Sequence, residues 1–127
     1  MGCERLTKIV SSYKNLQSGL DLLDRQWRQS NKRNVVKFGE GETLEHVLLK
    51  AEACWRLKKL KKQFYTEAVF KNNVGRADIF VINPTTAVEI VCSESEESIE
   101  NKKLKYNCDL IVIKSKKDFE KVERILC

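Results

Sequence analysis

The stretch from Gly75 to Val91 constrains the fold of this chain more than any other part of the sequence. Two apolar runs rich in β-branched residues flank Asn83-Pro84, and this pattern predicts two antiparallel strands joined by a short turn. With the turn centred there, Asp78 lies opposite Glu89 on one face of the sheet, with Cα atoms roughly 4.5–5.5 Å apart. Because like charges placed side by side destabilise a sheet, we expect a divalent metal ion between the two carboxylates.

Length and composition predict a globular protein with one core. The chain has 127 residues, of which 42% are hydrophobic and 33% are charged, and these values are typical of soluble domains. No apolar run approaches the roughly 18–20 residues that a membrane-spanning helix needs, and no signal-peptide pattern is present. We therefore predict an intracellular, cytoplasmic protein that does not contact a membrane.

The repeating patterns after residue 42 predict an α/β fold with a mixed central sheet flanked by helices. A helix over residues 42–62 is indicated by Leu44, Leu48, Ala51 and Trp55, which we expect to form its buried stripe. Strands are expected over 64–70, 76–82, 87–92 and 108–113. A capping box of Ser93 and Glu96 predicts a helix that ends near residue 106, and a closing helix is expected over 116–126.

The first 41 residues form a separate region in this interpretation, with the α/β domain at 42–127. Helical spacing of apolar residues predicts an N-terminal helix over 5–23. A basic arm follows from Arg25 to Lys37, and it contains Trp27 but no acidic residue. The arm either contacts phosphates, with Trp27 stacked on a base, or is a solvated linker whose Trp packs on the domain.

The net charge of +6 is unevenly distributed along the chain. Residues 1–41 carry +4, residues 42–74 carry +3 and residues 75–127 carry −1. A basic surface beside an acidic, metal-binding pocket suits a protein that acts on a polyanion such as nucleic acid.

The cysteines and the histidine show no metal-site spacing. The five cysteines are far apart and are expected to be small buried residues or chain-end thiols, although a Cys92–Cys108 bridge is conceivable. The lone His46 is expected to be a surface or half-buried helix residue.

The expected first helix contains an acid, the second strand contains Asp78 and the third strand contains Glu89. In this pattern, residues 42–113 resemble the PD-(D/E)XK nuclease superfamily, whose restriction-endonuclease-like core has the order αβββαβ. The archaeal Holliday-junction resolvases are similar in size. The resemblance implies a metal-dependent endonuclease in which Asp78, Glu89 and Glu45 hold Mg²⁺ or Mn²⁺ and hydrolyse DNA phosphodiester bonds.

Two positions depart from the motif of that superfamily. Ala77 stands where the motif has proline, and Val91 stands where it has the catalytic lysine. Some members supply this lysine from the following helix, so Lys102 is the first candidate, ahead of Lys103 and Lys105. Without such a lysine the site would be weakened or inactive.

Six residues are candidates for nucleic-acid binding: Arg25, Trp27, Arg28, Lys32, Arg33 and Arg76. Arg76 either contacts a substrate phosphate or forms a salt bridge with one of the acids. Beside the nuclease, two alternatives remain open: a catalytically inactive module that binds nucleic acid, and a structural or assembly protein. A homodimer is possible in each case.

Overall fold

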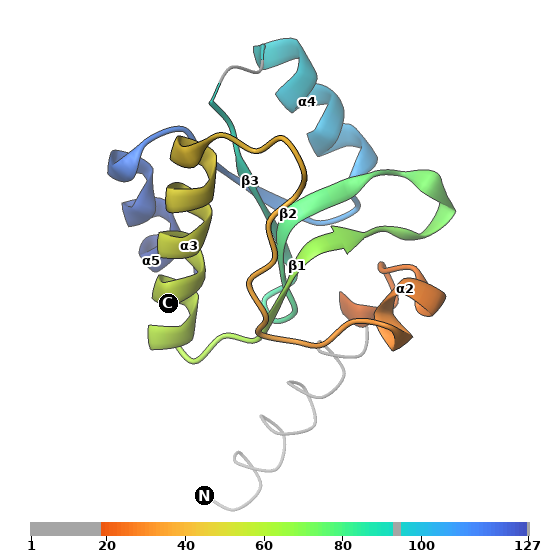
Figure 1. The fold of residues 1–127 in the computed structure, drawn as a ribbon. Helices are drawn as coiled ribbons and strands as arrows, with labels where there is room; N and C mark the ends of the chain where they lie inside the picture. The colour runs from red at the N-terminus through yellow and green to blue at the C-terminus, as the bar shows by residue number, and fades with distance from the viewer. Residues whose placement is uncertain (1–18, 93–94, 127) are drawn as a thin grey trace, which may run out of the picture.

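The computed structural model describes residues 19–92 and 95–126. The protein is a mixed α/β structure with one four-stranded sheet, which confirms the predicted α/β class (Figure 1). Its elements are α2 (Arg25–Gln29), α3 (Leu44–Lys59), β1 (Phe64–Val69), the short 3₁₀ helix η1 (Lys71–Asn73), β2 (Arg76–Val81), β3 (Thr86–Ile90), α4 (Glu96–Lys105), β4 (Asp109–Ile113), the 3₁₀ helix η2 (Lys116–Asp118) and α5 (Phe119–Leu126).

The strands lie in the order β1-β2-β3-β4. β1 pairs antiparallel with β2, β2 pairs antiparallel with β3, and β4 lies parallel to β3, so the sheet is mixed. The turn between β2 and β3 contains a cis Asn83–Pro84 bond. The ladder between these strands pairs Ile79 with Val88, and this is the register that the sequence predicted.

Both faces of the sheet are covered by apolar side chains. On one face, α3 and α5 pack against the sheet through residues such as Leu57 and Phe119. On the other face, Leu20 and Leu23 pack with Phe70, Phe80 and Tyr106. Figure 1 shows α3 and α5 together on one side of the sheet, with α2 on the opposite side of β1. The segment from residue 19 to 23 therefore shares a core with the sheet.

The predicted buried stripe of α3 is wrong. Leu44, Leu48 and Trp55 are 73%, 58% and 54% exposed. The buried face of the helix instead carries Leu49, Lys50, Ala53, Cys54 and Leu57. Both sets of residues recur at helical spacing, and the sheet that α3 packs against selects the second set.

The predicted start of α4 is also shifted. Ser95, rather than Ser93, is the N-cap, and its side chain accepts a hydrogen bond from the Ser98 backbone N–H. The expected N-terminal helix over 5–23 falls mostly outside the described residues.

The basic arm is not an isolated loop, because α2 forms within it and the segment after α2 runs beside β1. The Phe64 N–H donates to the Asn34 side chain, and the Lys37 N–H donates to the hydroxyl of Thr66. The half-buried Trp27 makes an edge-to-face contact with Tyr65, with ring centroids 5.4 Å apart. Trp27 thus packs on the domain, which is the second of the two interpretations of the arm.

Within residues 19–92 and 95–126, none of the helices combines the length and the apolar character that crossing a membrane requires.

Candidate metal centre

Three acidic residues lie in register across three neighbouring strands. Glu67 of β1 stands opposite Asp78 of β2, because it lies between the pairs Thr66–Ile79 and Ala68–Ala77. Asp78 in turn stands opposite Glu89 of β3, one step beyond the pair Ile79–Val88. Glu67 has a φ of +50°, a conformation that is rare for a non-glycine residue and is associated with functional sites. We call these three residues the acid row.

Glu89 is the most buried member of the acid row, with 3% of its surface exposed. Lys102 Nζ lies 3.4 Å from Glu89 Oε2, and Tyr106 Oη lies 3.2 Å from Oε1. Burial, and after it the charge of Asp78, raise the pKa of Glu89 to about 8, although Lys102 opposes this shift. In the absence of a metal ion, this carboxyl therefore holds a proton at neutral pH.

Lys50 is the positive charge at the other end of the acid row. Its side chain comes from α3 and has no exposed surface. The Nζ lies 3.1 Å from Glu42 Oε1 and also pairs with Glu67 Oε1. A buried ammonium is tolerated only where carboxylates neutralise it, and here two of them do.

The charge of Glu42 is stabilised by its surroundings. Burial by itself raises the pKa of this carboxyl, but a hydrogen bond from the Gly39 backbone, a contact with the Glu67 side chain, and the hydrogen bond and charge of Lys50 outweigh it, so that the pKa is lowered overall. Glu42 is therefore ionised at neutral pH and can bind a cation.

Glu42, His46 and Asp78 form a group that could hold a metal ion. One ligand atom from each lies within 4.8 Å of the others. His46 Nε2 is 3.5 Å from Asp78 Oδ1 and 3.8 Å from Glu42 Oε1. Two oxygen or nitrogen ligands that each lie ~2.1 Å from one ion are at most about 4.2 Å apart, so these separations suit a shared ion. We call these three residues the metal group.

Two atoms of the metal group are buried but unsatisfied. Among the residues that the structure describes, Glu42 Oε2 and His46 Nε2 have no hydrogen-bond partner. A buried polar atom without a partner destabilises the fold by about 1–3 kcal/mol. A cation bound between these atoms would remove that penalty, so the residues present fit a metal.

Local structure explains how the chain positions these ligands. Gly41 has a φ of +77°, which a glycine adopts without strain and which turns the chain into α3. The Thr43 side chain then caps the helix by accepting a hydrogen bond from the His46 N–H. Glu42 lies just before the cap and His46 in the first turn, and His46 Nε2 is 3.8 Å from Glu42 and 3.5 Å from Asp78. A hollow of about 260 Å³ lies here and is also lined by Val91 and Cys92.

The predicted site residues have different positions. Asp78 belongs to the metal group, and its Oδ2 accepts a hydrogen bond from the Ile90 N–H at 2.7 Å. Glu89 lies beside Asp78, and Lys102 reaches Glu89 from α4. Glu45 is exposed, and the metal group takes Glu42 and His46 from this part of the chain instead. Val91 is buried beyond the end of β3, where its N–H donates to the Ile113 carbonyl.

The basic candidates lie elsewhere or are already paired. Arg76 is 63% exposed at its side chain and lies 3.6 Å from Glu67, an acid of β1 that the sequence had not indicated as its partner. Arg33 donates to the Gln63 side chain, and Arg25, Arg28 and Lys32 belong to α2 or the segment after it. Cys92 and Cys108 are free thiols, so the conceivable bridge between them is not formed.

The sequence patterns did not indicate Glu42, His46, Lys50 or Glu67 as site residues. The i, i+4 spacing of Glu42 and His46 directly after Gly41 was a usable signal for the first two. No local signal pointed to Lys50 or Glu67, because their pairing joins a helix to a strand. Comparison with protein-family models, curated proteins and solved structures found no match for the chain.

Proposed function

We propose that the chain is a metal-dependent nuclease of the PD-(D/E)XK type that hydrolyses phosphodiester bonds in DNA. The element order from α3 to β4, with three antiparallel strands and a fourth strand parallel to β3, supports this proposal. So does the position of Asp78 and Glu89 on adjacent strands. Fold resemblance alone is weak evidence for activity, so the proposal depends on the site.

The observation that carries the proposal is the convergence of Glu42, His46 and Asp78, with buried ligand atoms that have no partner among the described residues. These three side chains would hold the ion. When bound, the ion would supply the Lewis acidity that activates a water molecule and neutralises charge on the phosphate. In the hydrolysis, the water oxygen would bond to phosphorus as the P–O bond to the leaving nucleoside oxygen breaks, and the proton lost by the water would be balanced by one gained by that oxygen.

In this proposal Glu89 has the acid–base part of the reaction and Lys102 has an electrostatic part. The pKa of Glu89, at about 8, lies near neutral pH, where a carboxylate can both accept and release a proton. Lys102 lies 3.4 Å from Glu89, and its proposed role is to stabilise negative charge on the phosphate. In this proposal it takes the role of the lysine that Val91 cannot fill.

The ligand set favours Mn²⁺ over Mg²⁺. Mg²⁺ prefers oxygen ligands, whereas His46 offers an imidazole nitrogen. Mn²⁺ accepts carboxylates and binds nitrogen ligands more readily. We therefore propose Mn²⁺ as the more effective of the two expected cofactors.

The test is cleavage of supercoiled, branched and single-stranded DNA by the full chain, with Mn²⁺, with Mg²⁺ and with EDTA. Wild type is compared with Asp78→Asn and with Asp109→Asn. Asp109 lies at the exposed start of β4, so its variant controls for the loss of one charge. We expect Mn²⁺-dependent cutting that falls at least about 100-fold in Asp78→Asn and is unchanged in Asp109→Asn.

Two results would argue against a nuclease. Cutting that persists unchanged in Asp78→Asn would come from a contaminant. Salt-sensitive DNA binding without cutting in wild type, retained in Asp78→Asn, would instead identify a module that binds nucleic acid through lysine and arginine contacts.

A further inference from the structure

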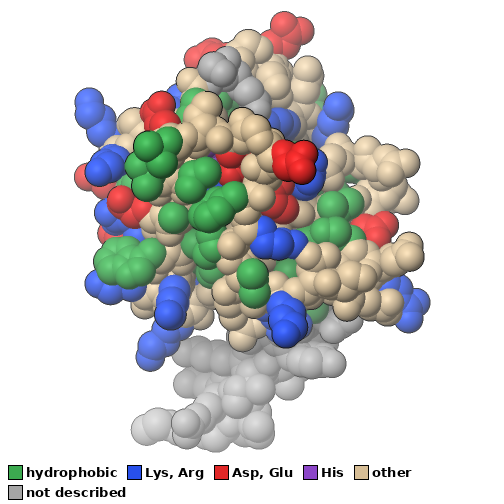
Figure 2. Space-filling view, in the orientation of Figure 1, with side chains coloured by type: hydrophobic (Ala, Val, Ile, Leu, Met, Phe, Trp, Pro, Cys, Tyr) green, Lys and Arg blue, Asp and Glu red, His purple; other side chains and the backbone are tan. Residues whose placement is uncertain are grey.

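The outward side of α3 carries a stripe of apolar side chains. Leu44, Leu48, Ala51 and Trp55 are spaced by four, three and four residues, which is the spacing of a helix–helix seam. Three of them are more than half exposed. We call these four residues the α3 stripe. Figure 2 shows hydrophobic side chains gathered on this face of the molecule.

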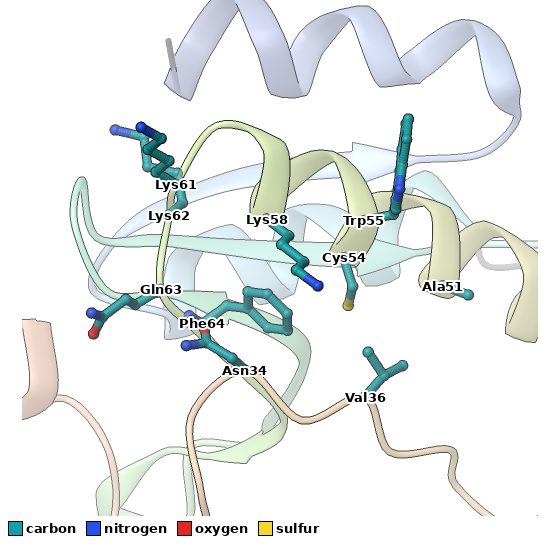
Figure 3. A pocket seen from close by; sticks show the side chains of 10 residues that line it. All are labelled: Asn34, Val36, Ala51, Cys54, Trp55, Lys58, Lys61, Lys62, Gln63 and Phe64. Atoms are coloured by element: carbon teal, nitrogen blue, oxygen red, sulfur yellow. Dashed lines mark hydrogen bonds between the residues drawn. The ribbon is translucent and has the colours of Figure 1, made fainter.

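The apolar surface continues beyond the helix. Val36 and Phe38 are 39% and 51% exposed on the segment beside α3. A hollow of about 590 Å³ lies between this segment and the helix, and Val36, Ala51 and Phe64 are among the residues that line it. In Figure 3, Val36 faces α3 across the hollow, and the Cys54 thiol points into it. A contiguous apolar surface of this kind on a soluble protein marks a contact with another molecule.

The charges along α3 identify the kind of partner. Glu45 and Glu52 lie in the N-terminal and middle parts of the helix, whereas Lys58 and Lys59 lie in its last turn. Lys61 and Lys62 follow directly. Nucleic acid needs a continuous cationic surface. This stripe is apolar, with acids beside its N-terminal and middle parts and lysines only at its C-terminal end, where Lys59 Nζ lies 4.5 Å from the centre of the Trp55 ring. Its two ends are instead complementary in charge to each other.

We propose that the α3 stripe is the interface of a homodimer in which two copies of α3 pack antiparallel about a two-fold axis. In such an interface, each contact occurs twice, with the roles of the two copies exchanged. An axis near Glu52 places Glu45 of one copy beside Lys59 of the second copy. A parallel arrangement would instead bring the lysine-rich ends of the two helices together, where their charges repel. The antiparallel arrangement also aligns the helix dipoles favourably.

The hollow between α3 and the segment that contains Val36 is also consistent with the antiparallel dimer. With the axis near Glu52, Trp55 of the second copy lies level with residue 49, over the part of the stripe between Leu48 and Ala51, and Ala51 lines the hollow. The indole can then enter space that is open in one copy. Large aromatic side chains that fill pockets dominate the binding energy of many interfaces.

The test is the mass of the full chain in solution, measured by sedimentation velocity and light scattering from low to high micromolar concentration. We expect a concentration-dependent dimer. Leu48→Glu is expected to raise its dissociation constant at least about tenfold, because a carboxylate would be buried without a partner. Leu104→Glu makes the same change on α4, at a side chain that is 83% exposed, and is expected to leave the dimer unchanged.

A charge exchange tests the antiparallel arrangement. Glu45→Lys and Lys59→Glu should each weaken the dimer, and the two substitutions together should restore it. Far-UV circular dichroism of each variant verifies folding. A single-chain mass at every concentration, or an equal effect of Leu48→Glu and Leu104→Glu, would overturn the interface. A double variant no better than the single ones would overturn the antiparallel arrangement.

Discussion

The two sides of α3 differ in a way that is unusual for a helix on a sheet. Its inward side includes Lys50, a lysine with no exposed surface, and the half-buried His46. Its outward side includes Leu44 and Leu48, both more than half exposed. Charge is thus buried, while large apolar side chains lie at the surface.

The difference shows that the residues on each side of α3 suit the surface that this side contacts. The N-terminal half of the inward side meets the acid row, where Glu67 provides a counter-charge for Lys50 and Asp78 lies 3.5 Å from His46. The C-terminal half of the same side meets the apolar core through Leu57. The outward side meets no part of the described chain that would cover it. A site and a proposed interface therefore lie on opposite sides of one helix.

The largest expected effect comes from the buried charge. Lys50→Met keeps the length of the side chain but leaves Glu42 and Glu67 without their shared cation. We expect the free energy of unfolding to fall by about 3–5 kcal/mol, as when one partner of a buried ion pair is removed. Denaturant titration of the metal-free protein measures it.

Lys103→Met is the matched control for this substitution, because the Lys103 side chain is 51% exposed. Its effect should remain within about 0.5 kcal/mol. Equal effects of the two substitutions would mean that the buried Lys50 and the exposed Lys103 do not differ in the way the structure shows.

The next effect concerns the metal group. His46→Ala removes one of three ligand side chains, so the dissociation constant for Mn²⁺ should rise at least about tenfold. Isothermal titration with Mn²⁺ measures this change directly. Glu45→Ala, an exposed neighbour on the same helix, should leave it unchanged. If Glu45→Ala had the larger effect, the metal would be held by the other side of the helix.

A further effect is expected in the pH dependence of stability. The pKa of Glu89 rises from its ordinary value of 4.5 to about 8 in the folded protein. Below pH 4.5, Glu89 is protonated in both the folded and the unfolded state, and its contribution to stability is complete. Between pH 4.5 and 8 the folded state keeps this proton while the unfolded state has released it, so the free energy of unfolding falls as the pH rises. In metal-free protein, Glu89→Gln should reduce the loss of stability between pH 5 and pH 8. Denaturation midpoints across this range test it, and an unchanged slope would contradict it.

The smallest effect is expected on the α3 stripe. Leu44 is 73% exposed, so Leu44→Ala should change the free energy of unfolding by less than about 0.5 kcal/mol in dilute, monomeric protein. Leu57→Ala, on the inward side and fully buried, should cost about 2–5 kcal/mol. Thermal or denaturant unfolding of both variants compares the two sides directly. A large loss in Leu44→Ala would show that this side is covered within one chain.

The hairpin shows how far local sequence can predict structure. Its two strands are adjacent in the chain and alternate around one turn, so the pairing of Ile79 with Val88 follows from the position of Asn83-Pro84. The proximity of Asp78 and Glu89 could be predicted for the same reason. Lys102 could be proposed from the sequence because α4 is the first helix after β3. The contact between Lys102 and Glu89, however, depends on how α4 packs against the sheet.

The orientation of α3 could not be predicted in this way. Its sequence contains two sets of residues at helical spacing, one that includes Leu44 and Leu48 and one that includes Leu49 and Leu57. Periodicity predicts a helix but not which set faces the sheet. That choice depends on strands that come later in the chain, and it also determines which side chains of the helix start point toward Asp78.

The sequence by itself determined the α/β class, the hairpin register and the two acids opposite each other, because these follow from alternation and turn chemistry over short distances along the chain. The tertiary structure alone decided that Glu42 and His46, rather than Glu45, join Asp78, and that Lys50 is buried between Glu42 and Glu67. The physical reason is that a charge can be buried only where an opposite charge meets it. In this protein those charges come from different elements.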